Sequence, residues 1–480
     1  MKTIVLFFNG SPAEDINIFL SVISSIKETN HPSTSWNIVA SRPILNRIER
    51  IKGIGYIDYD HFIRSRFPHV FHCSSLLKGV DEKKKVEIVT GFLLGRIGGK
   101  IAPSISKISI TTKKVDLVLE GVCDPCDGYG ASTHSLIKEY IKTRKGIGFF
   151  PRFYGESSSL IDPAVKASIV DNPISSSYLI YLALYDNLLN NIVSNNGILK
   201  GPNRSQNSKK ILMTMFESNK LPSTWAKRAK AFDKIIVPCS FCEEIFKESI
   251  NVPVFRIPLG IDIDLFSFVD RVPSVMRPFR FLILYANHPL FDDRKNALLG
   301  VKAFIELFAN NKDVELIVKL SGDPGGDLSK NWPSNIRIIN DRSTTQEVVN
   351  LYHECDALLF PSKGEGYGLP PREAMATGMP VIITNYSGLT DIASPDKTFP
   401  IEIDGLSPAN YVPWIYEQHN NGSSFIGNWA SVDYESLLSQ MRYVYLNQDK
   451  AFDIGRKGAE YIRENESISK TAQLIYDACI

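Results

Sequence analysis

The sequence predicts an α/β protein built from doubly wound domains, each a parallel sheet wrapped by helices. Short apolar runs such as KTIVLFF, WNIVAS, KVDLVLEG, FRFLILYAN, VELIVKLSG and DALLFPS have the length and composition of strands. Between many of them lie segments such as ASTHSLIKEYIK and NALLGVKAFIELFAN, whose apolar residues recur three and four apart, as in amphipathic helices. This alternation predicts parallel sheets covered by helices on their faces.

The predicted strands are too many for one sheet, so we expect two doubly wound domains. Prolines interrupt the pattern at residues 268–279, which marks the junction between them. We expect an N-terminal α/β extension over residues 1–114, a first domain over 115–275 and a second over 276–455. Residues 456–480 are expected to form a C-terminal helix. Its apolar stripe needs a partner surface, which we expect in residues 115–260; the stripe consists of Ile468, Ala472, Ile475, Tyr476 and Cys479. The sequence assigns no role to the extension.

Composition limits the classes of function. The 480 residues contain 54 Lys plus Arg and 52 Asp plus Glu, a formal charge of +2, which gives no strong field toward nucleic acid or an anionic membrane. No apolar run reaches the roughly 18 residues of a membrane span, so we expect a cytoplasmic protein. Seven cysteines, an odd number, suit a reduced compartment. Peripheral membrane contact and the oligomeric state stay open.

Two Cys-x-x-Cys pairs, Cys123 with Cys126 and Cys239 with Cys242, raise the question of zinc. Four thiolates can close a tetrahedral zinc site, but the gap between the pairs far exceeds that of a compact zinc ribbon. Each pair also follows a strand-like run, where small buried thiols are common. We favour core or loop cysteines and expect no metal.

A stretch rich in glycine and proline, PSKGEGYGLPPREAMATGMPVI, follows the strand-like DALLF. Its prolines suit the first turn of a helix, which places Gly366 and Gly368 in a strand-to-helix turn. In a parallel sheet this turn lies at the carboxyl edge, where ligands bind and the helix start offers free N–H groups. We therefore predict close backbone approach to a phosphate.

Two glutamates flank this turn, Glu365 in the loop and Glu373 in the expected first helical turn. Their separation suits two contacts on one extended ligand, and carboxylates bind vicinal hydroxyls well. The pair therefore suits two sugars on either side of a diphosphate. In the alternative interpretation, Glu373 only favours the helix N-terminus and Glu365 faces solvent.

The same stretch resembles the signature of the large retaining glycosyltransferase family that includes glycogen synthases and mannosyltransferases, and Glu365 and Glu373 match its Glu-x7-Glu motif. The segments RKNALLGVKAF, LIVKLSG and TTQEVVNLYHECDALLFPS follow the family's order. The resemblance covers roughly residues 115–480. It implies a GT-B fold, in which two Rossmann-like domains face a cleft and the C-terminal helix crosses back to the first, acceptor-side domain.

The resemblance also implies roles for these residues. Glu365 would meet the donor sugar, Glu373 the ribose, and the backbone of Gly366, Tyr367, Gly368 and Leu369 the diphosphate. A basic pair would neutralise the leaving phosphate. Lys295 matches the family's lysine, whereas the usual arginine is missing, so Arg294 or Lys319 is expected to replace it.

In the first domain the resemblance places a glycine loop in VLEGVCDPCDGYG, with Gly130 best suited to approach the phosphates across the cleft. A plain turn is the alternative. Where the family often has a histidine or an acid that touches the sugar, this chain offers Glu217, for which a buried structural acid is the alternative.

We therefore expect a retaining transferase that passes a sugar from a nucleotide diphosphate donor, a UDP- or GDP-sugar, to a hydroxyl of a glycan, lipid, protein or other acceptor. No cofactor is expected beside the donor. A nucleotide-sugar-binding protein without turnover and a nucleotide-sugar epimerase are the alternatives.

Overall fold

The chain divides into two structural units, residues 1–110 and 111–480. The computed structural model describes residues 2–8, 34–40, 54–58, 71–72, 117–122, 128–143, 147–153, 162–168, 178–182, 209–222, 224–286, 293–321, 332–340, 343–411 and 425–479. Cys123 and Cys126 lie outside these residues. Within the described parts of the chain, no helix is long and apolar enough to cross a membrane.

The first unit contains a parallel sheet with the strand order β3-β2-β1-β4. Its strands are β1 (Lys2–Phe8), β2 (Thr34–Ala40), β3 (Ile54–Asp58) and β4 (Phe71–His72). The apolar runs at β1 and β2 were predicted as strands, whereas β3 and β4 were not. The expected α/β extension therefore contains a parallel sheet of its own.

The second unit contains two parallel sheets. The first has the order β10-β9-β8-β7-β5-β6, and we call the part built on it the first domain. Its elements are β5 (Leu117–Val122), α6 (Gly128–Thr143), β6 (Ile147–Phe153), α7 (Pro163–Ala167), β7 (Tyr178–Leu182), β8 (Lys209–Met213), α9 (Trp225–Ala229), β9 (Lys234–Val237), α10 (Ser240–Ser249) and β10 (Val254–Arg256). The chain order reverses between β5 and β7, which creates a topological switch point.

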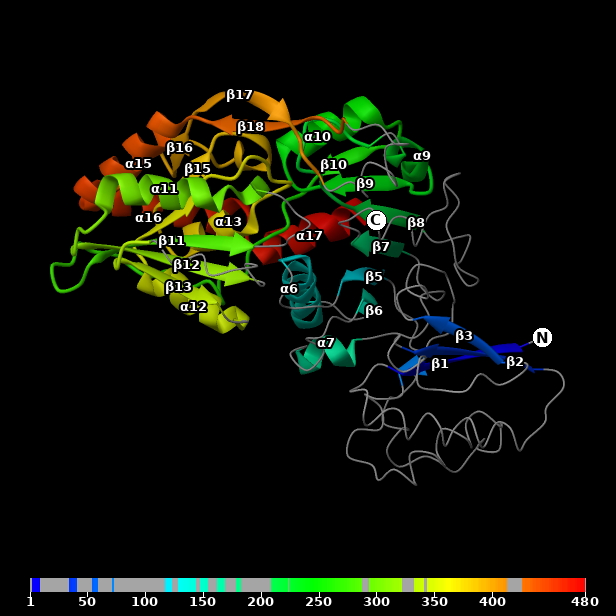
Figure 1. Cartoon of the computed structure of the whole chain (residues 1–480). Helices are drawn as coiled ribbons and strands as arrows, with labels where there is room; N and C mark the ends of the chain where they lie inside the picture. Colours follow the sequence, from blue (N-terminus) through cyan, green and yellow to red (C-terminus); the bar gives the residue numbers. More distant parts are fainter. Residues whose placement is uncertain are drawn as a thin grey trace. The chain divides into compact units, whose positions relative to one another are not determined.

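The other sheet has the order β13-β12-β11-β14-β15-β16, and we call the part built on it the second domain (Figure 1). Its switch point lies between β11 and β14. Its elements are β11 (Phe279–Ala286), η3 (Asp293–Lys295), α11 (Ala297–Phe308), β12 (Val314–Ser321), β13 (Ile336–Asn340), α12 (Thr345–Glu354), β14 (Ala357–Phe360), α13 (Leu369–Ala376), β15 (Val381–Thr384), η4 (Ser387–Leu389), β16 (Phe399–Ile401), β17 (Ile403–Pro408), β18 (Asn428–Val432), α15 (Tyr434–Leu446), α16 (Gln448–Asn465) and α17 (Ile468–Cys479). Strands β17 and β18 form a separate antiparallel pair.

Strand residues of the second sheet alternate between two apolar cores. On β11, Phe281 and Ile283 pack with α11 and α15, whereas Leu282 packs with α12 and α13 on the opposite face. Successive strand side chains point to opposite faces, so a sheet covered on both sides needs continuous apolar runs. This explains why FRFLILYA has no polar alternation.

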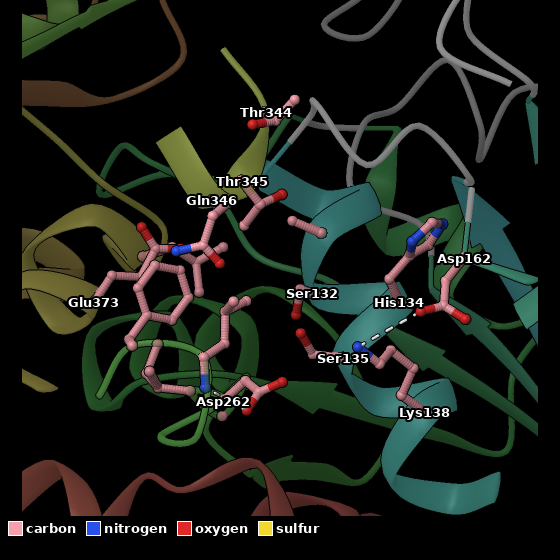
Figure 2. A pocket seen from close by; sticks show the side chains of 16 residues that line it. Ser132, His134, Ser135, Lys138, Asp162, Asp262, Thr344, Thr345, Gln346 and Glu373 are labelled. Atoms are coloured by element: carbon pink, nitrogen blue, oxygen red, sulfur yellow. Dashed lines mark hydrogen bonds and ion pairs between the residues drawn. The ribbon is translucent and has the colours of Figure 1, made fainter. Parts of the chain in front are cut away.

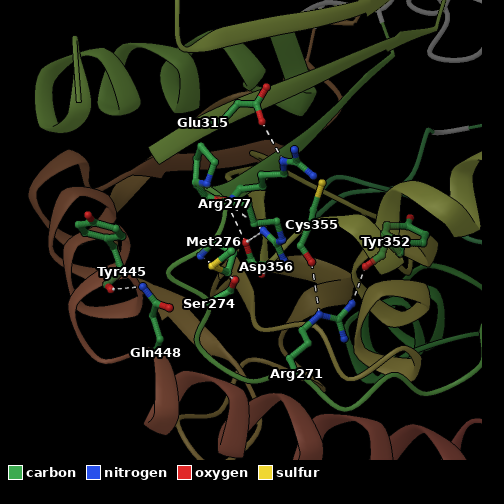
Figure 3. A network of polar contacts seen from close by, with 12 residues as sticks. Arg271, Ser274, Met276, Arg277, Glu315, Tyr352, Cys355, Asp356, Tyr445 and Gln448 are labelled. Atoms are coloured by element: carbon green, nitrogen blue, oxygen red, sulfur yellow. Dashed lines mark hydrogen bonds and ion pairs between the residues drawn. The ribbon is translucent and has the colours of Figure 1, made fainter. Parts of the chain in front are cut away.

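The segment that joins the two domains is anchored by two arginines (Figure 3). The guanidinium group of Arg271 donates hydrogen bonds to backbone carbonyls at the C-terminal ends of α12 and α13, those of Tyr352, Cys355 and Thr377. A cation is favourable there because helix C-termini carry unpaired carbonyls and the negative end of the dipole. Arg277 pairs with Asp356 through two contacts of 2.6 and 2.8 Å.

The C-terminal helix α17 packs on the first domain, beside α6 (Figure 1). Its residues Ile468, Ala472, Ile475 and Cys479 belong to the apolar core that also contains β5, β8 and β9. The Tyr140 hydroxyl of α6 donates to the Ala472 carbonyl at 2.9 Å. Four of the five residues of the predicted apolar stripe are buried, and Tyr476 packs partly against the same core.

The turn between α16 and α17 docks on the segment that follows the first sheet. Ile261 N donates to the Glu466 carbonyl and Ile468 N donates to the Ile261 carbonyl, each at 2.8 Å. Gly260 has a φ of 79°, and a Cβ atom there would lie 2.7 Å from the Thr471 hydroxyl. Glycine is therefore required at Gly260 both by conformation and by space.

We expect Ile475→Ala to lower the free energy of unfolding by about 2–4 kcal/mol, because the fully buried side chain leaves a cavity between α17 and the first sheet. Leu474→Ala, in the same helix but 38% exposed, is the matched control and should cost well below 1 kcal/mol. Denaturation of both variants measures the difference. Equal losses would contradict the docking of α17.

Candidate active site

The turn between β14 and α13 is shaped by its glycines. Gly368 has a φ of 84° and occupies the N-cap position of α13, with prolines in the first positions of the helix. At Gly366 an added Cβ atom would lie 2.6 Å from the Met215 side chain of the first domain. The turn therefore needs Gly368 for its backbone conformation and Gly366 for close contact with the first domain.

Four charged side chains from three segments meet beside this turn. Glu365 follows β14, Arg294 and Lys295 follow β11, and Glu217 follows β8. Lys295 Nζ lies 2.6 Å from Glu365 Oε1, and Arg294 Nη1 lies 3.3 Å from the same oxygen. Arg294 Nη2 lies 3.8 Å from Glu217 Oε1. We call these four residues the charged cluster.

The topology of the sheet explains this meeting. Strands β11 and β14 are parallel neighbours, so the segments after them emerge at the same edge, at the switch point. The Ser362 hydroxyl donates to Glu365 Oε1 at 2.8 Å, and Glu365 N donates to the Ser387 hydroxyl oxygen at 2.8 Å. The Glu365 carboxylate and backbone are therefore both held in place.

Burial and ion pairing act together on the charged cluster. Burial alone would raise the pKa of the Glu365 carboxyl, but Lys295 and Arg294 outweigh it and the pKa lies below its ordinary value. Burial lowers the pKa of the Lys295 ammonium, and Glu365 opposes that effect. The ion pair therefore stabilises the charged form of each partner.

The two candidate cations lie in different places. Arg294 is the residue it places against Glu365, where its side chain also donates to the Gly364 carbonyl. Lys319, near the carboxyl end of β12, is buried, and its ammonium donates to the Leu320 carbonyl at 2.8 Å. The second cation of the charged cluster is therefore Arg294.

Two positions differ from the sequence expectation. Helix α13 starts at Leu369, so Glu373 is its fifth residue and lies beyond the first turn in which it was expected. Helix α6 starts at Gly128, so Gly130 lies inside the first helical turn and not in a loop. In both cases the helix begins earlier than the sequence pattern indicated, because that pattern does not determine the first one or two residues of a helix.

Glu373 faces a cavity of about 340 Å³ between α6 and the second domain (Figure 2). The Tyr352 hydroxyl donates to Glu373 Oε2 at 2.9 Å. Burial raises the pKa of the Glu373 carboxyl to about 7. Leu369 also lines this cavity, whereas Tyr367, whose side chain is buried, is not among the lining residues.

The opposite wall of the cavity is polar. Helix α6 contributes Ser132, His134, Ser135 and Lys138, and Lys138 Nζ lies 3.7 Å from Asp162 Oδ2 at the start of α7. Thr345 and Gln346, in the first turn of α12, lie near Glu373 in the same wall of the second domain (Figure 2). None of these residues was expected from the sequence, because their convergence depends on how the two domains meet.

Behind the glycine turn lies a buried ion pair. Arg372 Nε is 2.6 Å from Glu466 Oε2, the Tyr367 hydroxyl donates to the same oxygen at 2.6 Å, and the guanidinium stacks 3.7 Å from the Tyr367 ring. Arg372 also donates to the carbonyls of Tyr367 and Gly388. The ion pair links the glycine turn to the turn between α16 and α17.

Known proteins resemble the part of the chain that contains this site. Residues 291–405, which include Lys295, Glu365 and Glu373, match the family model described as Glycosyl transferases group 1. A D-inositol 3-phosphate glycosyltransferase of Paenarthrobacter aurescens is 29% identical over 176 residues, which are 34% of this chain and 42% of that relative. The chain thus spans less than half of that relative's length.

Solved structures resemble most of the chain. The structure of Anabaena HepE in complex with UDP has a TM-score of 0.54 at 11% identity and covers 76% of this chain and 99% of that one. The fold is GT-B. A sucrose-phosphate synthase from Thermosynechococcus elongatus matches the same GT-B arrangement with a TM-score of 0.53 at 13% identity, over 76% of this chain and 98% of its own.

We expect the stability of the protein to depend on pH through Glu373. The folded-state pKa of about 7 lies above the ordinary value of 4.5, so the folded state holds this proton more tightly than the unfolded state. Stability is therefore favoured at low pH and is lost as pH rises from about 4.5 to about 7, by about 1–3 kcal/mol for a half-buried group.

Denaturation midpoints of wild type and Glu373→Gln at pH 5 and pH 8 measure this effect. The variant should gain stability relative to wild type at pH 8. Glu354→Gln, an exposed glutamate of the neighbouring helix α12, should follow wild type at both pH values. Parallel pH profiles for wild type and Glu373→Gln would show that burial does not perturb Glu373.

Proposed function

We propose that this protein is a retaining glycosyltransferase that moves a sugar from a nucleoside diphosphate sugar to an acceptor hydroxyl. The observation that carries the proposal is the charged cluster beside the glycine turn, where Lys295 and Arg294 converge on Glu365 at the switch point. Ligands of open α/β sheets bind at such points. The group 1 match over residues 291–405 favours transfer over binding alone or epimerisation.

The two cations suit a departing diphosphate. When the bond between the sugar and the phosphate breaks, negative charge grows on the phosphate oxygens. Preorganised cations therefore stabilise the transition state more than the ground state. Lys295 pairs with Glu365, and Arg294 pairs with Glu365 and Glu217. The carboxylates thus hold both cations beside the glycine turn.

Glu365 and Glu373 suit the hydroxyl groups of the donor. In our proposal Glu365, beside the cations, accepts hydrogen bonds from the transferred sugar, and the backbone of residues 366–369 meets the diphosphate. Glu373 accepts from the ribose in the cavity that it lines with Thr345 and Gln346. A charged carboxylate makes the stronger hydrogen bonds, so the donor would favour ionised Glu373.

Retention follows in this proposal from attack on the face that the phosphate leaves. The bond between the anomeric carbon and the phosphate oxygen breaks, the acceptor oxygen bonds to the same carbon, and the acceptor proton passes to a departing phosphate oxygen. No carboxylate nucleophile is needed. Glu217 is proposed to orient Arg294 and contact the sugar, which is consistent with its position 3.8 Å from that guanidinium.

A thermal-shift screen with UDP-, GDP- and ADP-sugars tests the donor class. We expect one group of sugar nucleotides to raise the melting temperature, since a ligand at 100 times its dissociation constant adds about 2.7 kcal/mol of stability. The UDP bound to HepE makes UDP-sugars the first choice. Absence of any shift with all three classes at millimolar concentration would contradict the proposal.

For the donor found in that screen, we expect Lys295→Ala to lower the turnover number at saturating donor by more than tenfold. Each 1.36 kcal/mol of lost transition-state stabilisation is a factor of ten. Release of the nucleoside diphosphate measures turnover, and Lys312→Ala, an exposed lysine of the same domain, is the control. A change confined to the Michaelis constant would mean that Lys295 binds ground state and transition state equally.

A further inference from the structure

Two cysteines of the first domain lie against the glycine turn of the second. Cys239 is the N-cap residue of α10, and its Sγ accepts a hydrogen bond from Cys242 N at 3.4 Å. Both side chains are fully buried, and both are free thiols. The start of α10 therefore directs two thiols away from solvent and toward the second domain.

Both thiols converge on one carbonyl group. Cys239 Sγ lies 3.1 Å and Cys242 Sγ lies 3.3 Å from the Gly366 oxygen. A carbonyl oxygen has two lone pairs and can accept both S–H donors. Burial raises the pKa of the Cys242 thiol well above its usual value, so it keeps its proton near neutral pH.

The opposite side of this carbonyl is also filled. A Cβ atom at Gly388 would lie 2.7 Å from the Gly366 carbonyl carbon and oxygen, so η4 approaches the same peptide closely. Cys242 Sγ is in addition 3.5 Å from the carbonyl of Phe216, the residue before Glu217. The thiols thus contact the backbone beside both carboxylates of the charged cluster, Glu365 and Glu217.

The direction of the Gly366 carbonyl determines the direction of the next N–H group. The described residues contain no cis peptide bond, and in a trans peptide the C=O and N–H point in opposite directions. Fixing the Gly366 oxygen toward α10 therefore fixes the Tyr367 N–H on the other side of the turn. This N–H belongs to the backbone that we assign to the diphosphate.

We propose that Cys239 and Cys242 are positioning residues that orient the Gly366–Tyr367 peptide for the diphosphate of the donor. This inference rests on the proposed function. It differs from both earlier interpretations of Cys-x-x-Cys, a zinc site and simple core filling. In the described parts of the chain no group of three or more His, Cys, Asp or Glu side chains could hold a metal. Core filling needs only volume, whereas positioning needs a hydrogen-bond donor.

The test compares three variants of the full chain. Cys239→Ala with Cys242→Ala removes both donors. Cys239→Ser with Cys242→Ser keeps two donors and places a favoured N-cap residue at the start of α10. Cys355→Ala truncates another fully buried free cysteine, after α12 in the second domain, and is the matched control. Titration calorimetry with UDP-glucose, GDP-mannose and ADP-glucose gives affinities, and thermal midpoints report folding.

We expect the double alanine variant to bind the recognised sugar nucleotide about tenfold more weakly, as the loss of two hydrogen bonds implies. The double serine variant should stay within about threefold of wild type, and Cys355→Ala should lower the thermal midpoint without changing affinity. If the double alanine variant does not fold, each single alanine variant should lose about threefold.

Wild-type affinity in a folded double alanine variant, or equal losses in the alanine and serine pairs, would overturn the positioning role and leave the proposed function standing. Failure of wild type to bind UDP-, GDP- or ADP-sugars would overturn the proposed function and this inference together. The two failures are therefore separable in one set of titrations.

Discussion

The buried ion pair between Arg372 and Glu466 constrains the whole second unit. Moving two such charges out of water costs several kcal/mol each, and the cost is offset only by good geometry and further hydrogen bonds. Here Glu466 accepts from Arg372 and Tyr367, and Arg372 also reaches the Gly388 carbonyl. All these contacts exist only when the glycine turn, η4 and the turn between α16 and α17 have one relative arrangement. The candidate active site and the passage of the chain from α16 to α17 therefore depend on the same ion pair.

The parts of the fold that sequence could predict depend on local pattern. Continuous apolar runs revealed the buried strands β11, β12 and β14, and the glycines and prolines after β14 revealed the turn at Gly366 and Gly368. The stripe on α17 required a partner surface, and the structure supplies it in the first domain. Such features can be predicted because they arise from residues that lie close together in the sequence. Strands β4 and β10 have two and three residues, too few for a pattern, and β3 contains a glycine and an aspartate among its five residues.

The parts that sequence could not predict depend on distant pairs. Arg372 and Glu466 are separated by 94 positions, and Cys239 and Gly366 by 127. Nothing in the local composition distinguishes Arg294 from Lys319 as the partner of Lys295, since only the strand order places Arg294 against Glu365. The perturbed carboxyl of Glu373 has the same origin, because its burial and its contact with Tyr352 come from the packing of α12 on α13.

The position of α17 in the core of the first domain has a consequence for biosynthesis. The ribosome must translate the second domain before helix α17, residues 468–479, can complete the apolar core against the sheet that begins at Leu117. At about 5–20 residues per second, the 220 positions from Leu259 to Cys479 take roughly 10–40 s. During that interval the nascent first domain exposes the apolar surface that α17 later covers. Chaperone binding to the emerging chain is therefore expected to concentrate on this surface.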